Sequence, residues 1–209
     1  MEKEIGKLVL VRHGESEWNE LGKWTGLTDV HLSEKGISDS KKIGEIINDL
    51  HFDQIFISKL VRTEETLSFM GSTNRELLEV PVEKAEELNE RDYGDYTGKN
   101  KWEIEKIIGE AEFQRLRRGW DYPVPKGENL KMVYERTVPF FLNKIMPILR
   151  EDKNVLVVAH GNSIRSIVKY IENITDNDVS NLEMPFEEIL IYDLDENGHS
   201  LKKEIRKIK

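Results

Sequence analysis

The sequence predicts a single α/β domain in three α/β/α layers, built on a mostly parallel sheet. Short β-branched runs alternate with helical stretches, and each connection is long enough to cross over the sheet. The chain has 209 residues, close to the usual size of one domain. It shows no internal repeat, low-complexity tract or heptad run. We therefore expect residues 1–209 to form one unit.

The first part of the chain reads as strand, helix, strand, helix. Lys7–Val11 (KLVLV) is a short apolar run typical of a buried strand. Ser33 is the expected N-cap of the next helix. The apolar residues of that helix recur with a period of about 3.6; they are Ile37, Ile43, Ile46, Ile47 and Leu50. Gln54–Ile57 predicts a second strand and Lys59–Phe69 a second helix.

The same alternation continues to the end of the chain. Lys101–Trp120 predicts a helix rich in Glu and Arg, and the breaker Asp121–Gly127 is too short to be a domain linker. Glu128–Leu149 predicts a long helix in which Pro139 causes a kink or a break. The remaining expected elements are a strand at Asn154–Ala159, a helix at Ser163–Ile171, a strand at Glu188–Leu194 and an edge strand in the tail Leu201–Lys209.

Composition excludes several classes of function. The chain carries 31 Lys and Arg against 40 Asp and Glu, a net charge of −9 that argues against a nucleic-acid partner. No apolar run reaches the roughly 20 residues needed to cross a bilayer, and no signal peptide is visible. Without Cys there is no disulfide, thiol nucleophile or cysteine-based metal site. These features favour a cytoplasmic, metabolite-handling protein without a membrane partner.

Two of the five His residues directly follow predicted buried strands. His13 and His160 each come at a strand end, and each is followed by Gly, which lets a ligand approach the backbone. In open α/β sheets ligands bind at the carboxyl ends of the strands, so we expect these two side chains to face one site. His31, His51 and His199 lie in polar, turn-like contexts and are expected at the surface.

Arginines near these strand ends predict a phosphorylated ligand. Arg12 adjoins His13, Arg62 follows the second strand, and Arg91 adjoins Glu90. An Arg at a buried strand end needs an anionic partner, and its planar guanidinium matches phosphoryl oxygens. A neutral imidazole, with its other nitrogen held by a backbone carbonyl, is a competent nucleophile toward phosphorus. Glu90 would then give a proton to the leaving alcohol.

The same residues allow three alternative interpretations. A metal hydrolase would use His13, His160, Glu15 and Glu90 as ligands, but the zinc-protease spacing is missing and the arginines would repel a cation, so no metal is expected. A nucleotide-binding module would need a glycine-rich phosphate loop, and neither common pattern occurs. A regulatory phosphate-binding domain without activity is disfavoured by the intact His13, Glu90 and His160.

The motifs resemble those of a known superfamily. Leu8–Asn19 (LVLVRHGESEWN) resembles the RHG signature of the histidine phosphatases, and Ala159–Ser163 (AHGNS) resembles their second motif. Within the superfamily the chain resembles the cofactor-dependent phosphoglycerate mutases from about residue 7 to 194. The strings that carry this narrower resemblance are LNERDY at Leu88–Tyr93, GKNK at Gly98–Lys101, RRG at Arg117–Gly119 and WTG at Trp24–Gly26, followed by Leu32-Ser33.

The resemblance implies a role for each site residue. His13 would become the phosphohistidine and Glu90 the proton donor. The transferring phosphoryl group would be held by Arg12, Asn19, Arg62 and His160, with Gly161 and Asn162 nearby. The carboxylate and second phosphate would be bound by Arg91, Tyr93, Lys101, Arg117, Arg118 and Asn162. The mouth would be lined by Ser16, Thr25 and Gly26.

The resemblance also implies the ligands. The substrate would be a small phosphorylated three-carbon acid, with 2-phosphoglycerate and 3-phosphoglycerate interconverted in glycolysis and gluconeogenesis. The cofactor would be 2,3-bisphosphoglycerate, the priming phosphoryl donor, without a metal. A mutase needs cations at both ends of its pocket to retain a bisphosphorylated intermediate, and Arg117-Arg118, together with Lys101 and Arg91, would supply the second group. The runner-up is a phosphomonoesterase that passes the same phosphoryl group from His13 to water.

The chain departs from the family pattern at four places. Asp92 stands where the family usually has His, and Leu27-Thr28 replace an aromatic pair. Only Pro123–Gly127 stand where many members have a longer insertion, which leaves a homodimer open. The C-terminal tail, which helps to close the site in the family, is short and rich in Lys. A leaky closure would admit water, so we expect some phosphatase side activity.

Overall fold

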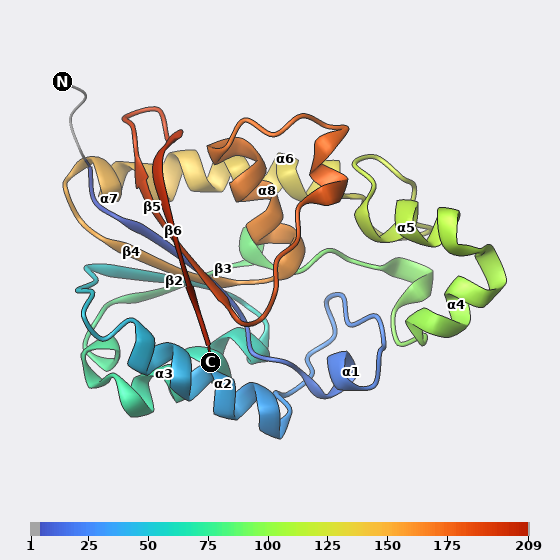
Figure 1. Cartoon of the computed structure of the whole chain (residues 1–209), viewed down its shortest axis with the longest axis horizontal. Helices are drawn as coiled ribbons and strands as arrows, with labels where there is room; N and C mark the ends of the chain where they lie inside the picture. Colours follow the sequence, from blue (N-terminus) through green and yellow to red (C-terminus); the bar gives the residue numbers. More distant parts are fainter. Residues whose placement is uncertain (1–4, 209) are drawn as a thin grey trace.

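A six-stranded sheet in the order β3-β2-β4-β1-β5-β6 forms the middle layer (Figure 1). The structure is a computed structural model that describes residues 5–208; residues 1–4 of the expected domain and Lys209 of the expected edge strand lie outside it. The strands are β1 (Leu8–Arg12), β2 (Gln54–Ser58), β3 (Val82–Ala85), β4 (Val155–Ala159), β5 (Glu188–Leu194) and β6 (Ser200–Lys207).

The first four strands pair in parallel with one another, and β5 runs in the opposite direction between β1 and β6. β1 pairs in parallel with β4, and β2 pairs in parallel with β4 and β3. β5 runs antiparallel to β1, and β6 runs antiparallel to β5, so the tail forms the expected edge strand. The prediction of a mostly parallel sheet is therefore confirmed, with an antiparallel pair added at one edge.

Helices cover both faces of the sheet, which confirms the three predicted layers (Figure 1). One face is covered by α2 (Glu34–Ile46) and α3 (Val61–Thr73), and the other by α6 (Leu130–Phe140), α7 (Met146–Arg150) and α8 (Gly161–Ile171). Three short helices, α1 (Glu17–Glu20), α4 (Lys101–Ile108) and α5 (Glu110–Arg118), lie beyond the sheet. The remaining turns are 3₁₀ helices at Arg75–Leu78, Glu86–Leu88, Gly94–Tyr96 and Asp178–Asn181.

Alternate residues of the central strands pack into two separate hydrophobic cores, one on each face of the sheet. In β1, Leu8 and Leu10 pack toward α6–α8, whereas Val9 and Val11 pack toward α2 and α3. All five residues of β4 are completely buried. A strand covered on both faces has no polar side, which explains why β1 and β4 are continuous apolar runs in the sequence.

The N-cap of α2 is as predicted. The Ser33 Oγ accepts a hydrogen bond from the Gly36 N–H at 3.1 Å, and Ile43 and Ile47 are buried against the sheet. The helix ends at Ile46, before the last apolar residue expected in it, Leu50.

Two of the predicted helices are interrupted. Lys101–Trp120 is not one helix, because Gly109 has a positive φ of 83° and separates α4 from α5. The stretch Glu128–Leu149 passes through Pro139 and then widens into a π-helical turn at Phe141–Ile145. Proline has no N–H for the preceding turn of the helix, so an irregular turn close to it is expected.

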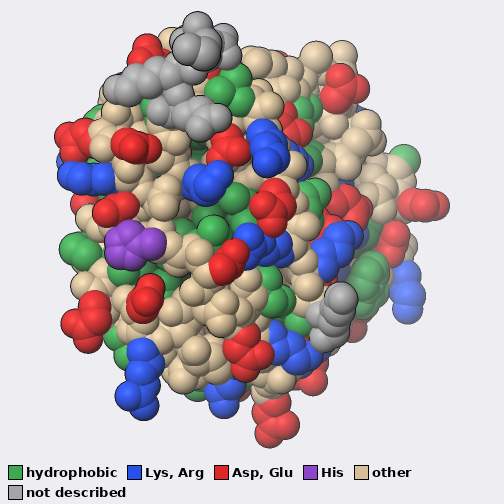
Figure 2. Space-filling model, turned by 60° about the vertical axis from the view of Figure 1, so that its left-hand side comes forward, with side chains coloured by type: hydrophobic (Ala, Val, Ile, Leu, Met, Phe, Trp, Pro, Cys, Tyr) green, Lys and Arg blue, Asp and Glu red, His purple; other side chains and the backbone are tan. Residues whose placement is uncertain are grey.

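Acidic and basic side chains are interspersed on the face shown in Figure 2. His31 and His51 are exposed, as predicted, whereas His199 is half-buried with its ring stacked on Tyr170 at 5.1 Å. Within residues 5–208 no helix combines the length and apolar character that crossing a bilayer would require.

Candidate active site

The ends of β1 and β4 bring His13 and His160 together. Arg12 pairs with Ala159 across the two strands, and the His13 N–H donates to the Ala159 carbonyl at 2.9 Å. The two imidazole rings are 4.8 Å apart between centroids, and both side chains are buried. The strand register thus places the two strand-end histidines beside one another, at the edge where the sequence predicts a ligand.

The environment of His13 fixes its tautomer and its charge. Its Nδ1 lies 2.7 Å from the Gly14 carbonyl, which can only accept, so Nδ1 carries the proton and Nε2 keeps its lone pair. Burial and the positive charges of Arg62 and Arg12 hold the pKa of His13 well below its ordinary value. The ring is therefore neutral and presents an unprotonated nitrogen.

His160 is held in a different way. Its Nε2 lies 2.7 Å from the Ser58 Oγ at the end of β2, and its Nδ1 is buried without a hydrogen-bond partner among the described residues. Burial, followed by the charge of Arg62, keeps the pKa of His160 well below the usual range. His160 is also the N-cap residue of α8, which begins at Gly161.

Two arginines, the buried Arg62 and the half-buried Arg12, stand beside the histidines without a carboxylate partner. Arg12 donates to the Met184 carbonyl at 2.6 Å, and Arg62 donates to the carbonyls of Gly26 and Thr28 at 2.8 and 3.0 Å. Within residues 5–208 neither guanidinium forms an ion pair, and each Nε is buried without a partner. Burial lowers the pKa of Arg62 to about 10, so it remains charged at neutral pH. Positive charge held only by carbonyls is suited to binding an anion.

Glu90 is a buried carboxylate with one oxygen occupied. Its Oε1 accepts from the Arg91 N–H at 2.7 Å and from the Asn162 Nδ2 at 2.8 Å, whereas its Oε2 has no hydrogen-bond partner among the described residues. Burial alone would raise the pKa of Glu90, but these hydrogen bonds and the charges of Arg12 and Arg62 lower it. The carboxylate is ionised in the free site.

Two adjoining pockets lie over these groups, with volumes of about 50 and 210 Å³. Both are lined by Arg12, Trp24, Glu90, Tyr93 and Lys101. The smaller pocket is also lined by His13, Asn19, Thr25, Gly26 and Arg62. The larger pocket is also lined by Arg117, Arg118, Gly161, Asn162, Arg165, Glu183, Met184 and Pro185. Most of the residues named from the sequence therefore meet in one continuous cleft.

A second group of cations lines the larger pocket, and Lys101 among them also lines the smaller pocket with His13. Lys101 comes from α4, and Arg117 and Arg118 come from the last turn of α5. Burial and the charges of Arg12 and Arg117 lower the pKa of Lys101 to about 8. Arg118 donates to the Glu183 Oε1 at 2.8 Å, so a carboxylate of the chain already contacts this group.

Three residues expected in the site, His160, Arg91 and Ser16, lie outside both pockets. Arg91 is completely buried, and its guanidinium donates to the carbonyls of Leu116 and Arg117, at the end of α5. Ser16 is buried as the N-cap of α1, and its Oγ donates to the Asn19 Oδ1 at 2.8 Å. The side chains of Arg91 and Ser16 are used to position the residues that line the pockets.

The sequence reasoning missed Arg165 and the segment Leu182–Phe186. Arg165 lies on α8 and is 7% exposed; its Nη1 donates to the Asn162 Oδ1 and its Nε to the Leu182 carbonyl. The Arg12 guanidinium lies over the ring of Phe186, with its Cζ 3.6 Å from the ring centroid. A signal for Arg165 was present, because it is a charged residue two positions after the second motif, in a predicted helix that directly follows a buried strand.

Metal ligands are not gathered in the described part of the chain. Within residues 5–208 no three His, Asp or Glu side chains are grouped so that they could hold a metal ion. The C-terminal tail, described as far as Ile208, contributes no residue to the lining of either pocket. The Ile208 N–H donates to the Glu187 carbonyl at 3.0 Å.

Comparison with curated proteins gives relatives along nearly the whole chain. A 2,3-bisphosphoglycerate-dependent phosphoglycerate mutase from Lactobacillus acidophilus is 39% identical over 227 aligned positions, which cover 96% of this chain and 98% of the relative. The enzyme of the same description from Streptococcus sanguinis is 38% identical, covering 94% and 97%. The alignments are longer than this 209-residue chain, so part of each relative has no counterpart here.

Solved structures share the fold at lower identity. The mycobacterial glucosyl-3-phosphoglycerate phosphatase with VO3 has a TM-score of 0.81 at 21% identity, covering 98% of this chain and 99% of that one. The alpha-ribazole phosphatase from Shigella flexneri has a TM-score of 0.78 at 20% identity, covering 97% and 95%. The family model described as the histidine phosphatase superfamily, branch 1, matches residues 8–205. Since that match includes both histidine motifs and all six strands of the sheet but the end of the last, this chain belongs to the histidine phosphatase superfamily.

Proposed function

We propose that the protein is a phosphoglycerate mutase that interconverts 2-phosphoglycerate and 3-phosphoglycerate through a phosphohistidine at His13, in glycolysis and gluconeogenesis. One observation carries the proposal. Cations lie at both ends of a single cleft, with the candidate nucleophile at one end only. The substrate is then a small phosphorylated acid handled in the cytoplasm, and neither nucleic acid nor membrane takes part.

The first half-reaction begins at the unprotonated Nε2 of His13. This nitrogen attacks phosphorus, the bond from phosphorus to the ester oxygen breaks, and the leaving oxygen takes a proton from Glu90. Arg12 and Arg62 stabilise the charge on the three equatorial oxygens, and the Gly14 carbonyl keeps the His13 ring oriented through Nδ1. In the second half-reaction the free hydroxyl of a monophosphoglycerate attacks the phosphohistidine, the bond from phosphorus to the His13 Nε2 breaks, and the hydroxyl proton goes to Glu90, so that 2,3-bisphosphoglycerate forms again.

Glu90 must change its protonation state for this role. It is ionised in the free site because two hydrogen bonds and two arginines stabilise its charge. A phosphorylated ligand brings negative charge close to the carboxylate and neutralises those arginines, and both effects raise its pKa. We therefore expect Glu90 to take up a proton when the ligand binds, with Oε2 as the oxygen that carries it.

The two groups of cations support a mutase over a phosphatase. A monophosphatase needs to bind one phosphoryl group, whereas a mutase must retain 2,3-bisphosphoglycerate while the intermediate turns round. Lys101, Arg117 and Arg118, which line the larger pocket, would hold the second phosphate, and the buried Arg165 lines the same pocket. The priming donor in this scheme is 2,3-bisphosphoglycerate, and no step requires a metal.

A phosphomonoesterase is the second candidate, because the far end of the cleft offers less positive charge to a second phosphate than the sequence suggested. Arg91 is directed at backbone carbonyls instead of the cleft, and Glu183 competes for Arg118. Both features reduce the positive charge available to a second phosphate.

A single assay separates these candidates. Formation of 2-phosphoglycerate from 3-phosphoglycerate is followed with and without 2,3-bisphosphoglycerate, in the presence of EDTA, and release of inorganic phosphate is measured in parallel. We expect isomerisation to depend on the bisphosphate, to be insensitive to EDTA and to exceed a low rate of hydrolysis. Hydrolysis faster than isomerisation would assign the protein to the phosphatases.

A further inference from the structure

We infer that Arg136, oriented by Glu128, is a positioning residue that holds Glu90 in place for proton transfer. The inference rests on the function proposed above, since it concerns the proton donor of that reaction. Neither residue lines the cleft, and neither was singled out in the sequence.

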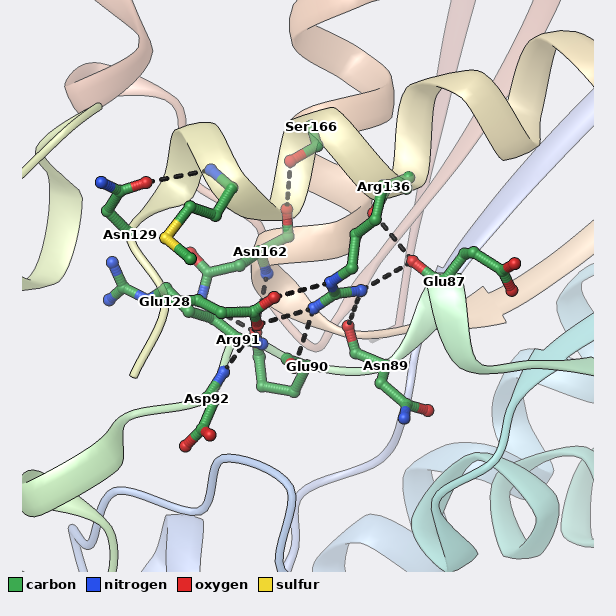
Figure 3. A network of polar contacts seen from close by, with 12 residues as sticks. Glu87, Asn89, Glu90, Arg91, Asp92, Glu128, Asn129, Arg136, Asn162 and Ser166 are labelled. Atoms are coloured by element: carbon green, nitrogen blue, oxygen red, sulfur yellow. Dashed lines mark hydrogen bonds and ion pairs between the residues drawn. The ribbon is translucent and has the colours of Figure 1, made fainter. Parts of the chain in front are cut away.

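Glu90 lies in a segment that no strand or helix holds in place. It follows the 3₁₀ turn Glu86–Leu88 and precedes the turn Gly94–Tyr96, so its backbone lacks the regular hydrogen bonds of a sheet or helix. A carboxylate on such a segment would wander relative to the substrate unless something else fixed the backbone. Three backbone carbonyls of this segment, those of Glu87, Asn89 and Glu90, nevertheless accept hydrogen bonds from α6 (Figure 3).

The guanidinium of Arg136 donates hydrogen bonds to three carbonyls of this segment. Its Nη1 donates to the carbonyls of Glu87 and Asn89 at 2.7 and 3.1 Å, and its Nη2 donates to the carbonyl of Glu90 at 3.1 Å. Thr137, the next residue of α6, adds a hydrogen bond from its Oγ1 to the Glu87 carbonyl at 2.8 Å. One side chain thus replaces the ladder of hydrogen bonds that a strand would have supplied.

Glu128 fixes the plane of that guanidinium. Its Oε1 accepts from the Arg136 Nε at 2.9 Å and its Oε2 from the Arg136 Nη2 at 3.0 Å, a two-point contact that allows one orientation. The same Oε2 accepts from the Asp92 N–H at 3.0 Å. The Arg136–Glu128 pair therefore holds the backbone on both sides of Glu90: the carbonyls up to residue 90 and the N–H of residue 92.

This backbone contact controls the carboxylate. The Glu90 Oε1 is bound by the Arg91 N–H, which belongs to the braced segment, and by Asn162, which belongs to α8. Moving the segment would separate these two donors and turn Oε2 away from the substrate. A displacement of about 1 Å at a reacting group can cost roughly 100-fold in rate.

Lysine cannot substitute for this arrangement. An ammonium is a point charge on a flexible stem, whereas the contacts here need a planar fork that reaches three carbonyls and a carboxylate together. Arg136→Lys keeps the positive charge near the site and removes the fork, so it tests position separately from charge.

The test compares two phosphoryl donors in a rapid-quench measurement of phosphohistidine formation. Departure of an alcohol from 2,3-bisphosphoglycerate needs a proton from Glu90, whereas p-nitrophenyl phosphate releases a stable phenolate without one. We expect Arg136→Lys to slow phosphorylation by 2,3-bisphosphoglycerate by roughly 10-fold or more, with phosphorylation by the aryl ester changing less than about 3-fold. Glu128→Gln should change the same ratio in the same direction, by a smaller factor.

The matched control is Arg206→Lys. Its side chain is 22% exposed against 23% for Arg136, and it also binds a carbonyl and a carboxylate, those of Ile46 and Asp49, far along the chain from Glu90. We expect this variant to react with both donors at the wild-type rates.

Each outcome decides the inference. If Arg136→Lys and Glu128→Gln slow phosphorylation equally with both donors, the Arg136–Glu128 pair has only a general role in stability and the inference is overturned. The inference is overturned as well if Arg206→Lys changes the ratio of the two phosphorylation rates as much as Arg136→Lys does. If Arg136→Lys does not fold, Glu128→Gln alone decides. If the wild-type protein is not phosphorylated by 2,3-bisphosphoglycerate, the proposed function fails; the inference is then judged by the same ratio for hydrolysis of an alkyl and an aryl phosphate.

Discussion

The rings of His13 and His160 lie 4.8 Å apart, but they use opposite nitrogens. In His13, Nδ1 donates a hydrogen bond to the Gly14 carbonyl and Nε2 keeps its lone pair. In His160, Nε2 is hydrogen-bonded to the Ser58 Oγ, and Nδ1 is buried without a partner among the described residues. Only His13 lines the smaller pocket. The pair is therefore unequal in function: His13 is suited to attack, and His160 is suited to support the bound group.

Replacing His13 with Gln should abolish phosphoryl transfer. The substitution keeps a polar side chain of similar reach but removes the nucleophilic nitrogen, so we expect a loss of roughly 1,000-fold or more in both isomerisation and hydrolysis. The measurement is trapping of an acid-labile phosphoenzyme after mixing with 2,3-bisphosphoglycerate. His51→Gln, at an exposed histidine, is the control and should behave as wild type. A phosphoenzyme that persists in His13→Gln would refute the assignment.

Replacing Arg117 with Ala should damage the mutase reaction selectively. A charge-assisted hydrogen bond contributes about 1.5–3 kcal/mol, so kcat/KM for 3-phosphoglycerate should fall by roughly 10- to 100-fold. Hydrolysis of p-nitrophenyl phosphate, which has no second anionic group, should change less than about 3-fold.

Arg115→Ala provides the matched control for this experiment. Arg115 lies on the same helix, but its side chain is 67% exposed and is paired with Glu112. We expect no selective loss of isomerisation in this variant. An equal loss of both activities in Arg117→Ala would contradict the proposal that a second group of cations distinguishes the mutase.

Lys101 should make substrate binding depend on pH. Burial and the charges of Arg12 and Arg117 lower the pKa of Lys101 to about 8. The side chain is charged below this pH and neutral above it, so kcat/KM for 3-phosphoglycerate should fall as the pH rises through about 8. Because bound substrate stabilises the charged form, the fall should appear in KM and leave kcat nearly constant. Arg stays charged over this range, and Lys101→Arg should flatten the profile; identical profiles would exclude Lys101 as the titrating group.

The sequence sufficed for the parts of the fold that are buried on both sides. β1 and β4 are continuous apolar runs because each of their faces meets a layer of helices, and the histidines that end them could be paired from topology alone. By contrast, β3 has four residues, of which three are exposed, so nothing in its sequence resembles a buried strand.

Other features depend on contacts between distant segments. The sequence does not distinguish the environments of Arg91 and Arg117. In the structure the Arg91 guanidinium donates to carbonyls of α5, whereas Arg117 lines the cleft. Arg136 reaches the Glu87 carbonyl across 49 positions in the chain. The break at Gly109 could have been expected, since a glycine that adopts a positive φ ends a helix readily.

The packing of Gly36 against the segment after His13 predicts the cost of a single methyl group. A Cβ at residue 36 would lie 2.0 Å from the Glu15 carbonyl oxygen and 2.8 Å from the Glu15 nitrogen, and both are backbone atoms that cannot rotate away. Gly36→Ala must therefore move α2 away from residues 14 and 15. We expect a loss of about 1–3 kcal/mol in the free energy of unfolding and a Tm lower by roughly 2–4 °C for each of these kcal/mol.

The same displacement should reach the site, because the Gly14 carbonyl holds the Nδ1 of His13. Gly36→Ala should lower kcat as well as Tm, measured at a temperature where the variant is fully folded. Ser38→Ala, at an exposed position of α2, separates this effect from any general consequence of adding alanine to the helix and should leave both quantities unchanged. An unaltered Tm in Gly36→Ala would mean that α2 does not pack on the segment after His13 as closely as the structure places it.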